Sequence, residues 1–206
     1  PVQKRWALIR GGKLDEAVDL ALKYTPFPAT VCGHLCPNLC MQHCTRQTIH
    51  LPAVDVRLLG RASLGAAAPE PAPPTGRKIA VIGGGPAGLS VAWQLRLMGH
   101  EPVIHEQHPR LGGKITETIP SSRIPDAVLD HELARAGGLL RHVRKAVTRK
   151  GFEDLKKRYD FIVVAVGARK PRLIDVPGRE RAMAALDFLR LSKAGRARVG
   201  RSVVVI

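Results

Sequence analysis

The hydrophobic and polar positions of the first thirty residues repeat with the period of an α-helix. The pair Gly11-Gly12 separates a short helix around Lys4–Arg10 from a second, longer helix. Pro26 and Pro28 end that second helix and lead the chain into a loop. The second helix has one apolar face, because its apolar residues fall at positions i, i+3, i+4, i+7 and i+8: Leu14, Ala17, Val18, Ala21 and Leu22.

The periodicity then stops in a stretch of alanine and proline. The segment GAAAPEPAPPTG, residues 65–76, has no helical or strand period, and its composition is typical of an extended linker. We therefore expect a boundary between a small helical segment and whatever follows.

After this linker the pattern changes to strand, turn and helix. Short β-branched runs alternate with helical stretches, an order that predicts an α/β fold with a parallel, Rossmann-type sheet. The predicted strands are Lys78–Ile82, Glu101–Glu106, a buried Asp160–Val166 and a buried Ser202–Ile206, and the predicted helices are Leu89–Met98 and Asp126–Ala136.

The turn after the first strand is Gly83-Gly84-Gly85-Pro86-Ala87-Gly88, a G-x-G-x-x-G motif. In this context Gly83 allows a tight turn, Gly85 lets the backbone approach a pyrophosphate, and Gly88 lets the helix pack closely. Glu106, at the end of the second strand, is placed to accept hydrogen bonds from ribose hydroxyls. These features predict a dinucleotide site.

Two later features favour FAD as the dinucleotide. Leu111-Gly112-Gly113 follows the acidic residue, and Val166-Gly167-Ala168 ends a later strand. Both lie where flavoproteins commonly bring the chain beside the cofactor. No acid–base or nucleophile constellation stands out, and a flavin needs none.

All four cysteines, Cys32, Cys36, Cys40 and Cys44, fall within thirteen residues at a repeated spacing of four. This clustering indicates metal binding rather than a disulfide framework, and it is not the spacing of common zinc knuckles. Thiolates with a proline after one cysteine suit iron–sulfur ligation. Structural zinc, with His34 or His43, and free thiols remain the alternatives.

The composition narrows the functional classes. A hydrophobic fraction of 45% in 206 residues supports a folded core, and no apolar run reaches the roughly 18 residues that span a bilayer. No signal peptide is evident, so a cytoplasmic protein is expected. The net charge of +16 invites a nucleic-acid interpretation, but aromatic residues are only 4%, which leaves few stacking platforms. A basic surface, a phosphate-rich cofactor or an acidic redox partner accounts for the charge equally well.

Taken together, the motifs CGHLCPNLCMQHC, KIAVIGGGPAGLSVAWQLRLMGHEPVIHE, LGG, IPSSRIP and YDFIVVAVGARKPR resemble the glutamate synthase small-subunit family. They are also similar to the amino-terminal half of dihydropyrimidine dehydrogenase. The resemblance implies an electron-transfer unit in which NADPH or NADH reduces FAD. The flavin then passes electrons through [4Fe-4S] clusters to a partner subunit or domain.

The resemblance also assigns residues. It implies that Cys36 and Cys40 are ligands of one cluster and Cys44 of another, whereas Cys32 matches a position that is not always a ligand. The implied FAD contacts are Gly83, Gly85, Pro86, Ala87, Gly88, Glu106, Gly113, Lys114, Arg123, Val147 and Gly167.

Two departures from the family pattern mean that this chain cannot complete two clusters by itself. The chain also ends before the glycine loop that follows a strand like SVVVI in the family, so we expect a fragment. The chain begins at Pro1 without the family's upstream cysteines, and Gly60 stands where relatives carry a Glu or Gln ligand. The resemblance implies an iron–sulfur domain over 1–64, a linker over 65–77, an FAD domain over 78–190 and the start of an NAD(P)H domain over 191–206. A non-catalytic electron-relay module and a zinc-stabilised nucleic-acid binder are the alternative functions.

Overall fold

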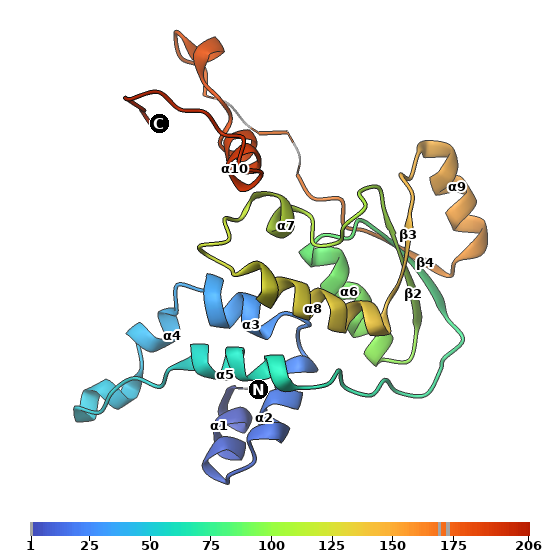
Figure 1. Ribbon diagram of the computed structural model, residues 1–206. Helices are drawn as coiled ribbons and strands as arrows, with labels where there is room; N and C mark the ends of the chain where they lie inside the picture. Colours follow the sequence, from blue (N-terminus) through green and yellow to red (C-terminus); the bar gives the residue numbers. More distant parts are fainter. Residues whose placement is uncertain (1, 169, 172–173) are drawn as a thin grey trace.

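The computed structural model describes residues 2–168, 170–171 and 174–206, and its centre is a parallel sheet (Figure 1). The strand order is β3-β2-β1-β4, and every pairing is parallel. This order confirms the predicted α/β fold of Rossmann type. The strands are β1 (Lys78–Ile82), β2 (Glu101–Glu106), β3 (Arg141–Arg144) and β4 (Phe161–Val164).

Successive side chains of β1 enter two different cores. Ile79 and Val81 pack in the larger core, which lies beneath α6 (Pro86–Leu97) and α8 (Asp126–Leu139). Ala80 and Ile82 pack on the opposite face against Leu155 of α9 (Arg149–Arg158). Because successive side chains of a strand point to opposite faces, a run as apolar as KIAVI belongs in the middle of a covered sheet.

The amino-terminal segment is helical, as predicted, and packs against the same body. Its second helix buries Ala17, Val18, Ala21 and Leu22. Phe27, beyond that helix, belongs to the same larger core as Ile79. The helical elements of this segment are α1 (Val2–Arg10), α2 (Leu14–Leu22), α3 (Pro28–Thr30), the π-helix η1 (Val31–Leu35), α4 (Leu39–Gln42), η2 (Thr45–Ile49), α5 (Val56–Ala62) and η3 (Ser63–Gly65).

The predicted linker is extended, and it lies against the end of α6. The Ala72 N–H donates to the Leu97 carbonyl at 2.9 Å, and the Thr75 N–H donates to the Gly99 carbonyl at 2.9 Å. At Gly99 a Cβ atom would lie 2.1 Å from the Pro73 oxygen. This contact explains why glycine follows the helix there.

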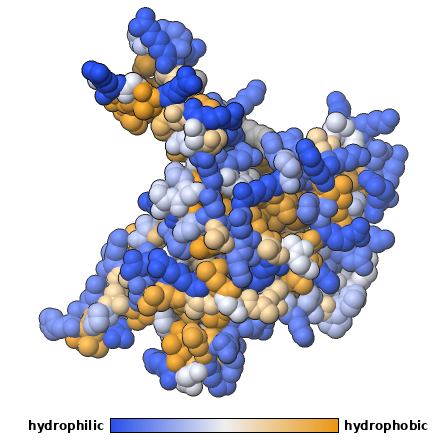
Figure 2. Space-filling model, in the orientation of Figure 1, coloured by the Kyte–Doolittle hydropathy of each residue, from blue (hydrophilic) through white to orange (hydrophobic). Residues whose placement is uncertain are grey.

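Two strand predictions need correction. Asp160–Val166 was expected to be a buried strand, but β4 is shorter and lies at the sheet edge, where Phe161 and Val164 are more than half exposed. Ser202–Ile206 was also expected to be a buried strand. It forms no strand and is exposed, as the hydrophobic surface near the carboxyl end shows in Figure 2. Both expectations followed from local apolarity, whereas burial requires a neighbouring strand or a covering layer.

The last elements pack at the other end of the sheet from the linker. α10 (Ala185–Lys193) contacts α7 (Lys114–Thr118), and the Lys193 ammonium donates to the Ile119 carbonyl at 2.8 Å. The helix η4 (Arg179–Arg181) precedes α10. Among the residues described, no helix has the length and apolarity needed to cross a bilayer.

Candidate dinucleotide site

A cavity of about 350 Å³ opens at the carboxyl ends of the strands. It lies where β1 is flanked by β2 on one side and β4 on the other, so the chain crosses over the sheet in opposite directions from this point. Ligands of open α/β sheets bind at such switch points. The predicted cofactor residues that line the cavity are Gly83, Gly85, Pro86, Ala87, Glu106, Gly113, Lys114, Val147 and Gly167.

The three motif glycines differ in backbone conformation and in how closely other atoms surround them. Gly83 has φ +106°, and a Cβ there would lie 2.4 Å from the Ala165 oxygen. A Cβ on Gly88 would lie 1.9 Å from the Gly83 oxygen, so α6 can approach the turn only with glycine at this position. Gly88 therefore lies beneath the turn, outside the cavity lining. Gly85, by contrast, has an ordinary extended backbone, and a Cβ there would meet no atom within 4 Å.

Glu106 joins the end of β2 to the glycine turn. Its side chain is buried, and one carboxylate oxygen accepts from the Gly84 N–H at 2.7 Å while the other accepts from the His108 N–H at 2.8 Å. Burial alone would raise the pKa of Glu106, but these backbone donors outweigh it and hold the pKa below its ordinary value. Each oxygen retains a lone pair for a further donor such as a ribose hydroxyl.

The second glycine pair forms the opposite wall. The Gly112 N–H donates to the Gly84 carbonyl at 2.8 Å. A Cβ on Gly113 would lie 3.0 Å from the Cα of Gly85, so the two backbones are in direct contact. Helix α6 begins just beyond, with Gly85 as its N-cap and Pro86 in its first turn. The cavity is thus bounded by bare backbone and a helix amino end, the arrangement that accommodates a pyrophosphate.

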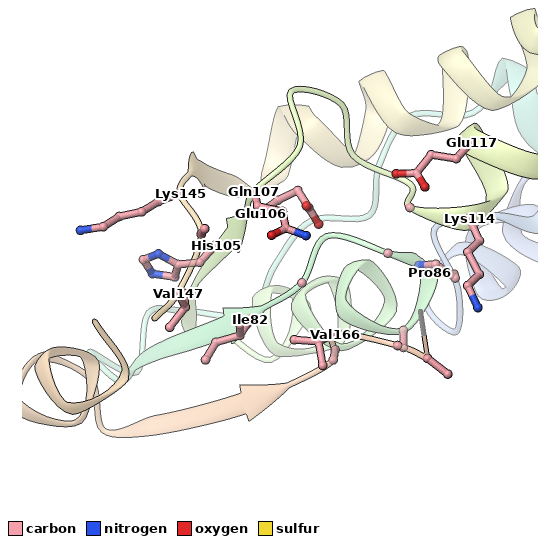
Figure 3. Close-up of a pocket in the computed structure, with 18 of the residues that line it drawn as sticks. Ile82, Pro86, His105, Glu106, Gln107, Lys114, Glu117, Lys145, Val147 and Val166 are labelled. Atoms are coloured by element: carbon pink, nitrogen blue, oxygen red, sulfur yellow. The ribbon is translucent and has the colours of Figure 1, made fainter. Parts of the chain in front are cut away.

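The structure does not bring Arg123 to this cavity. Arg123 is exposed in a turn between α7 and α8, where its N–H donates to the Pro120 carbonyl at 2.9 Å. Sequence reasoning missed other lining residues, because they lie at strand ends or on helices far along the chain: His105, Gln107, Glu117, Lys145, Ala146 and Arg190. In Figure 3, His105, Lys145 and Val147 lie toward one end and Lys114 and Glu117 toward the other, with Glu106 between them.

His105 is an unusual lining residue. Its ring is buried and meets Tyr159 edge-on at a centroid distance of 5.9 Å. Its Nε2 atom has no hydrogen-bond partner among the residues that the structure describes. Burial lowers the pKa of His105, and the positive charges of Arg158 and Lys145 lower it further. The imidazole is therefore held neutral at physiological pH.

The cysteines are not gathered into a metal site. Cys32 and Cys36 belong to η1 and its end, Cys40 is exposed on α4, and Cys44 precedes η2. In the part of the chain that the structure describes, no three His, Cys, Asp or Glu side chains lie together as metal ligands. Four thiols suit an iron–sulfur cluster chemically, but their arrangement here does not fit one.

Close packing explains why residue 60 is a glycine, which is one of the two departures from the family pattern. A Cβ at this position would lie 2.8 Å from both the Gly33 nitrogen and the Pro28 oxygen. Helix α5 therefore packs directly on the segment that carries Cys32, and a longer ligand side chain at residue 60 would force these helices apart.

The fold and the site together define a Rossmann-type sheet with a cavity of the kind that binds dinucleotides. Residues 81–138 match the family model described as an NAD(P)-binding Rossmann-like domain, which includes the glycine turn from Gly83 to Gly88, Glu106 and Gly113. Over most of its length the chain is similar to oxidoreductases. It is 31% identical, over 96% of its residues, to the NADPH-Fe(3+) oxidoreductase subunit beta of Geobacter sulfurreducens.

Two glutamate synthase [NADPH] small chains give similar matches. The chain is 29% identical to that of Bacillus subtilis over 90% of its residues, and 30% identical to that of Azospirillum brasilense over 88%. The resemblance to the glutamate synthase small-subunit family is thus confirmed. The chain spans 32% of the length of the Geobacter protein and 40% of each small chain. A solved amine oxidase from Pseudomonas geniculata N1 aligns with 58% of this chain and 19% of its own, at 24% identity and a TM-score of 0.39.

Proposed function

We propose that this chain carries the FAD site of an NAD(P)H-dependent oxidoreductase. The observation that carries the proposal is the contact between Gly85 and Gly113, which leaves two bare backbones and the amino end of α6 around one cavity. Such a surface accommodates a pyrophosphate without a side-chain clash. When bound, FAD supplies the hydride and electron chemistry, and the residues of this chain bind and orient it.

Glu106 supports FAD over NADPH as the occupant of this cavity. Its carboxylate is held ionised by backbone donors and is placed at the end of β2, where the ribose lies in Rossmann-type sites. An ionised carboxylate accepts hydrogen bonds from ribose hydroxyls and repels a 2′-phosphate. FAD has free ribose hydroxyls to donate to this carboxylate and carries no 2′-phosphate that it would repel. The nicotinamide nucleotide would then be a second ligand that reduces the flavin.

The experiment is a pair of glycine-to-valine variants. Gly85→Val adds a side chain in the open cavity, and its Cβ would meet no atom of the described residues within 4 Å, so the protein should fold normally and fail to bind the dinucleotide. Gly65→Val is the matched control, because a Cβ there also meets no atom and Gly65 does not line the cavity. Both proteins and the wild type are titrated with FAD, NADH and NADPH, and their thermal unfolding is recorded.

We expect wild type and Gly65→Val to bind FAD equally and Gly85→Val to bind at least 100-fold more weakly, with similar unfolding temperatures. Unchanged FAD affinity in Gly85→Val would show that the site is misassigned. Binding of NADH or NADPH without any binding of FAD would overturn the choice of cofactor.

The iron–sulfur part of the proposal concerns the four cysteines. It rests on the chemistry of four clustered thiols, Cys32, Cys36, Cys40 and Cys44, and on the similarity to the two oxidoreductase classes above. Because the sulfur atoms are not gathered here, we assign no step to a [4Fe-4S] cluster. Iron and sulfide content, measured for the wild type and for Cys40→Ser, tests this part; a wild-type protein that takes up no iron on reconstitution would end it.

We further propose that electrons leave this unit for a partner subunit or domain. The support is that the relatives are named as a beta subunit and as small chains. Co-purification from the native cell, followed by flavin reoxidation with the captured protein, tests this proposal.

A further inference from the structure

We propose that Glu132 and Arg135, one turn apart on α8, are positioning residues that fix the cysteine-bearing segment onto the dinucleotide-binding body. The inference rests on the proposed function only for the identity of the dinucleotide cavity, since the contacts themselves need no cofactor. In Figure 1, α8 lies alongside α3, and contacts between the two helices confirm this placement.

Glu132 caps a helix that begins a hundred residues earlier in the chain. Its two carboxylate oxygens accept from the backbone N–H groups of Ala29 and Thr30, each at 2.8 Å, and its side chain is 0% exposed. The N-cap residue of α3, Phe27, provides no side-chain acceptor. The first turn therefore obtains its acceptor from α8, in the position where a negative charge stabilises a helix amino end.

Arg135 supplies the opposite charge and three further backbone contacts. Its guanidinium lies 3.3 Å from a Glu132 oxygen, and the two side chains are 6% and 0% exposed. It donates to the carbonyls of Ser63 at 2.6 Å, Pro26 at 3.1 Å and Ala66 at 3.4 Å. The pair thus touches the chain just before α3 and just after α5, on both sides of the cysteine loop.

The geometry holds the segment that leads into Cys32 more tightly than an apolar contact would. Apolar packing tolerates sliding, whereas two short hydrogen bonds to one carboxylate fix the orientation of a helix. α3 continues directly into η1, and Cys32 lies two residues beyond Thr30. The position of Cys32 relative to the dinucleotide cavity is therefore set through Glu132. Glu132 and Arg135 thereby fix the separation between the cysteine-bearing segment and the dinucleotide cavity.

The test is hydrogen exchange measured by mass spectrometry on the full chain, without added FAD, for wild type and for Glu132→Gln. The amide of glutamine cannot accept from both N–H groups, so exchange in residues 28–36 should rise at least tenfold, about 1.4 kcal/mol of lost local protection. Exchange in Lys78–Ile82 should stay unchanged. Glu153→Gln is the matched control, because Glu153 is an exposed carboxylate of α9 paired with Lys156.

Equal acceleration in residues 28–36 and in β1 would show a merely structural role, and no acceleration would show that the contacts are unimportant; either result overturns the proposal. FAD affinity is measured on the same samples and should change less than twofold. Failure of wild type to bind FAD would count against the proposed function and would leave the exchange result valid.

If Glu132→Gln does not fold, hydrogen exchange in the wild type alone tests the proposal. Its Ala29 and Thr30 amides must exchange as slowly as those of β1, and exchange as fast as in residues 45–55 would refute the proposal.

Discussion

The buried carboxylate of Glu106 accepts a 2.7 Å hydrogen bond from the backbone N–H of Gly84, so the end of β2 and the glycine turn after β1 form one unit. The carboxylate that is placed to meet a ribose also fixes the turn that is placed to meet a pyrophosphate. The two halves of the proposed site are therefore coupled before any ligand arrives.

This coupling predicts the behaviour of Glu106→Gln. Hydrogen bonds to a charged group contribute about 1.5–3 kcal/mol, and the amide keeps one acceptor, so FAD affinity should fall modestly, by roughly tenfold. Because the folded pKa is below the unfolded value of 4.5, ionised Glu106 adds stability above pH 4.5 that is lost as the pH falls through the folded pKa. The stability difference between wild type and variant should thus be largest at neutral pH and shrink in acid, as measured by denaturant titration. A difference that grew in acid would contradict this account.

Gly88→Ala should disrupt the turn itself. The new Cβ would lie 1.9 Å from the Gly83 oxygen, a backbone atom that cannot move without displacing the turn. We expect a loss of at least about 1–3 kcal/mol in the free energy of unfolding, together with loss of FAD binding. Gly137→Ala on α8 is the control, since a Cβ there meets no atom. It should stabilise the protein by about 0.5–1 kcal/mol. Equal effects of the two substitutions would refute the packing argument.

The central strands and the glycine turn could be predicted from the sequence because their signals are local. KIAVI is apolar along its whole length, and the turn residues follow it directly. The strand β3 (Arg141–Arg144) could not be predicted in this way. All four of its residues are exposed at the sheet edge, so the sequence RHVR carries no apolar period.

Polar contacts between residues far apart in the chain could not be predicted from the sequence either. Glu132 lies in the predicted helix Asp126–Ala136, and nothing nearby in the sequence marks it as buried, because Ala29 and Thr30 are distant in the chain. The same reason explains why Arg190 was missed as a cavity residue. Local apolarity, in turn, misled the prediction for Ser202–Ile206, whose side chains are exposed.

His105→Phe should stabilise the protein and reduce its sensitivity to acid. Within the described part of the chain the buried Nε2 atom has no partner. An unsatisfied buried polar atom costs about 1–3 kcal/mol, so an apolar ring should recover about 1 kcal/mol. The folded pKa of His105 is below the unfolded value of 6.5, so wild type loses stability as the pH falls from 6.5 through the folded pKa, while the unfolded chain takes up a proton. Thermal unfolding at pH 7.5 and 5.5 measures both effects. A destabilised variant with the same acid sensitivity as wild type would show that the imidazole has a partner after all.

Two neighbouring residues of α6 provide a test of how the helical segment is held. The Trp93 indole donates to the Leu22 carbonyl at 2.7 Å in a buried setting, and the Gln94 amide donates to the Lys23 carbonyl at 2.8 Å in an exposed one. The two bonds have similar lengths and adjacent acceptors, and they differ chiefly in burial.

Trp93→Phe leaves the buried Leu22 carbonyl without its donor, so the free energy of unfolding should fall by about 1–3 kcal/mol, in addition to the effect of the smaller ring. Gln94→Ala leaves the Lys23 carbonyl exposed to water, which can replace the lost donor. The free energy of unfolding should therefore change by no more than about 0.5 kcal/mol. Chemical denaturation of the two variants measures the difference. Equal losses would mean that the helical segment is held by surface contacts as much as by its buried interface.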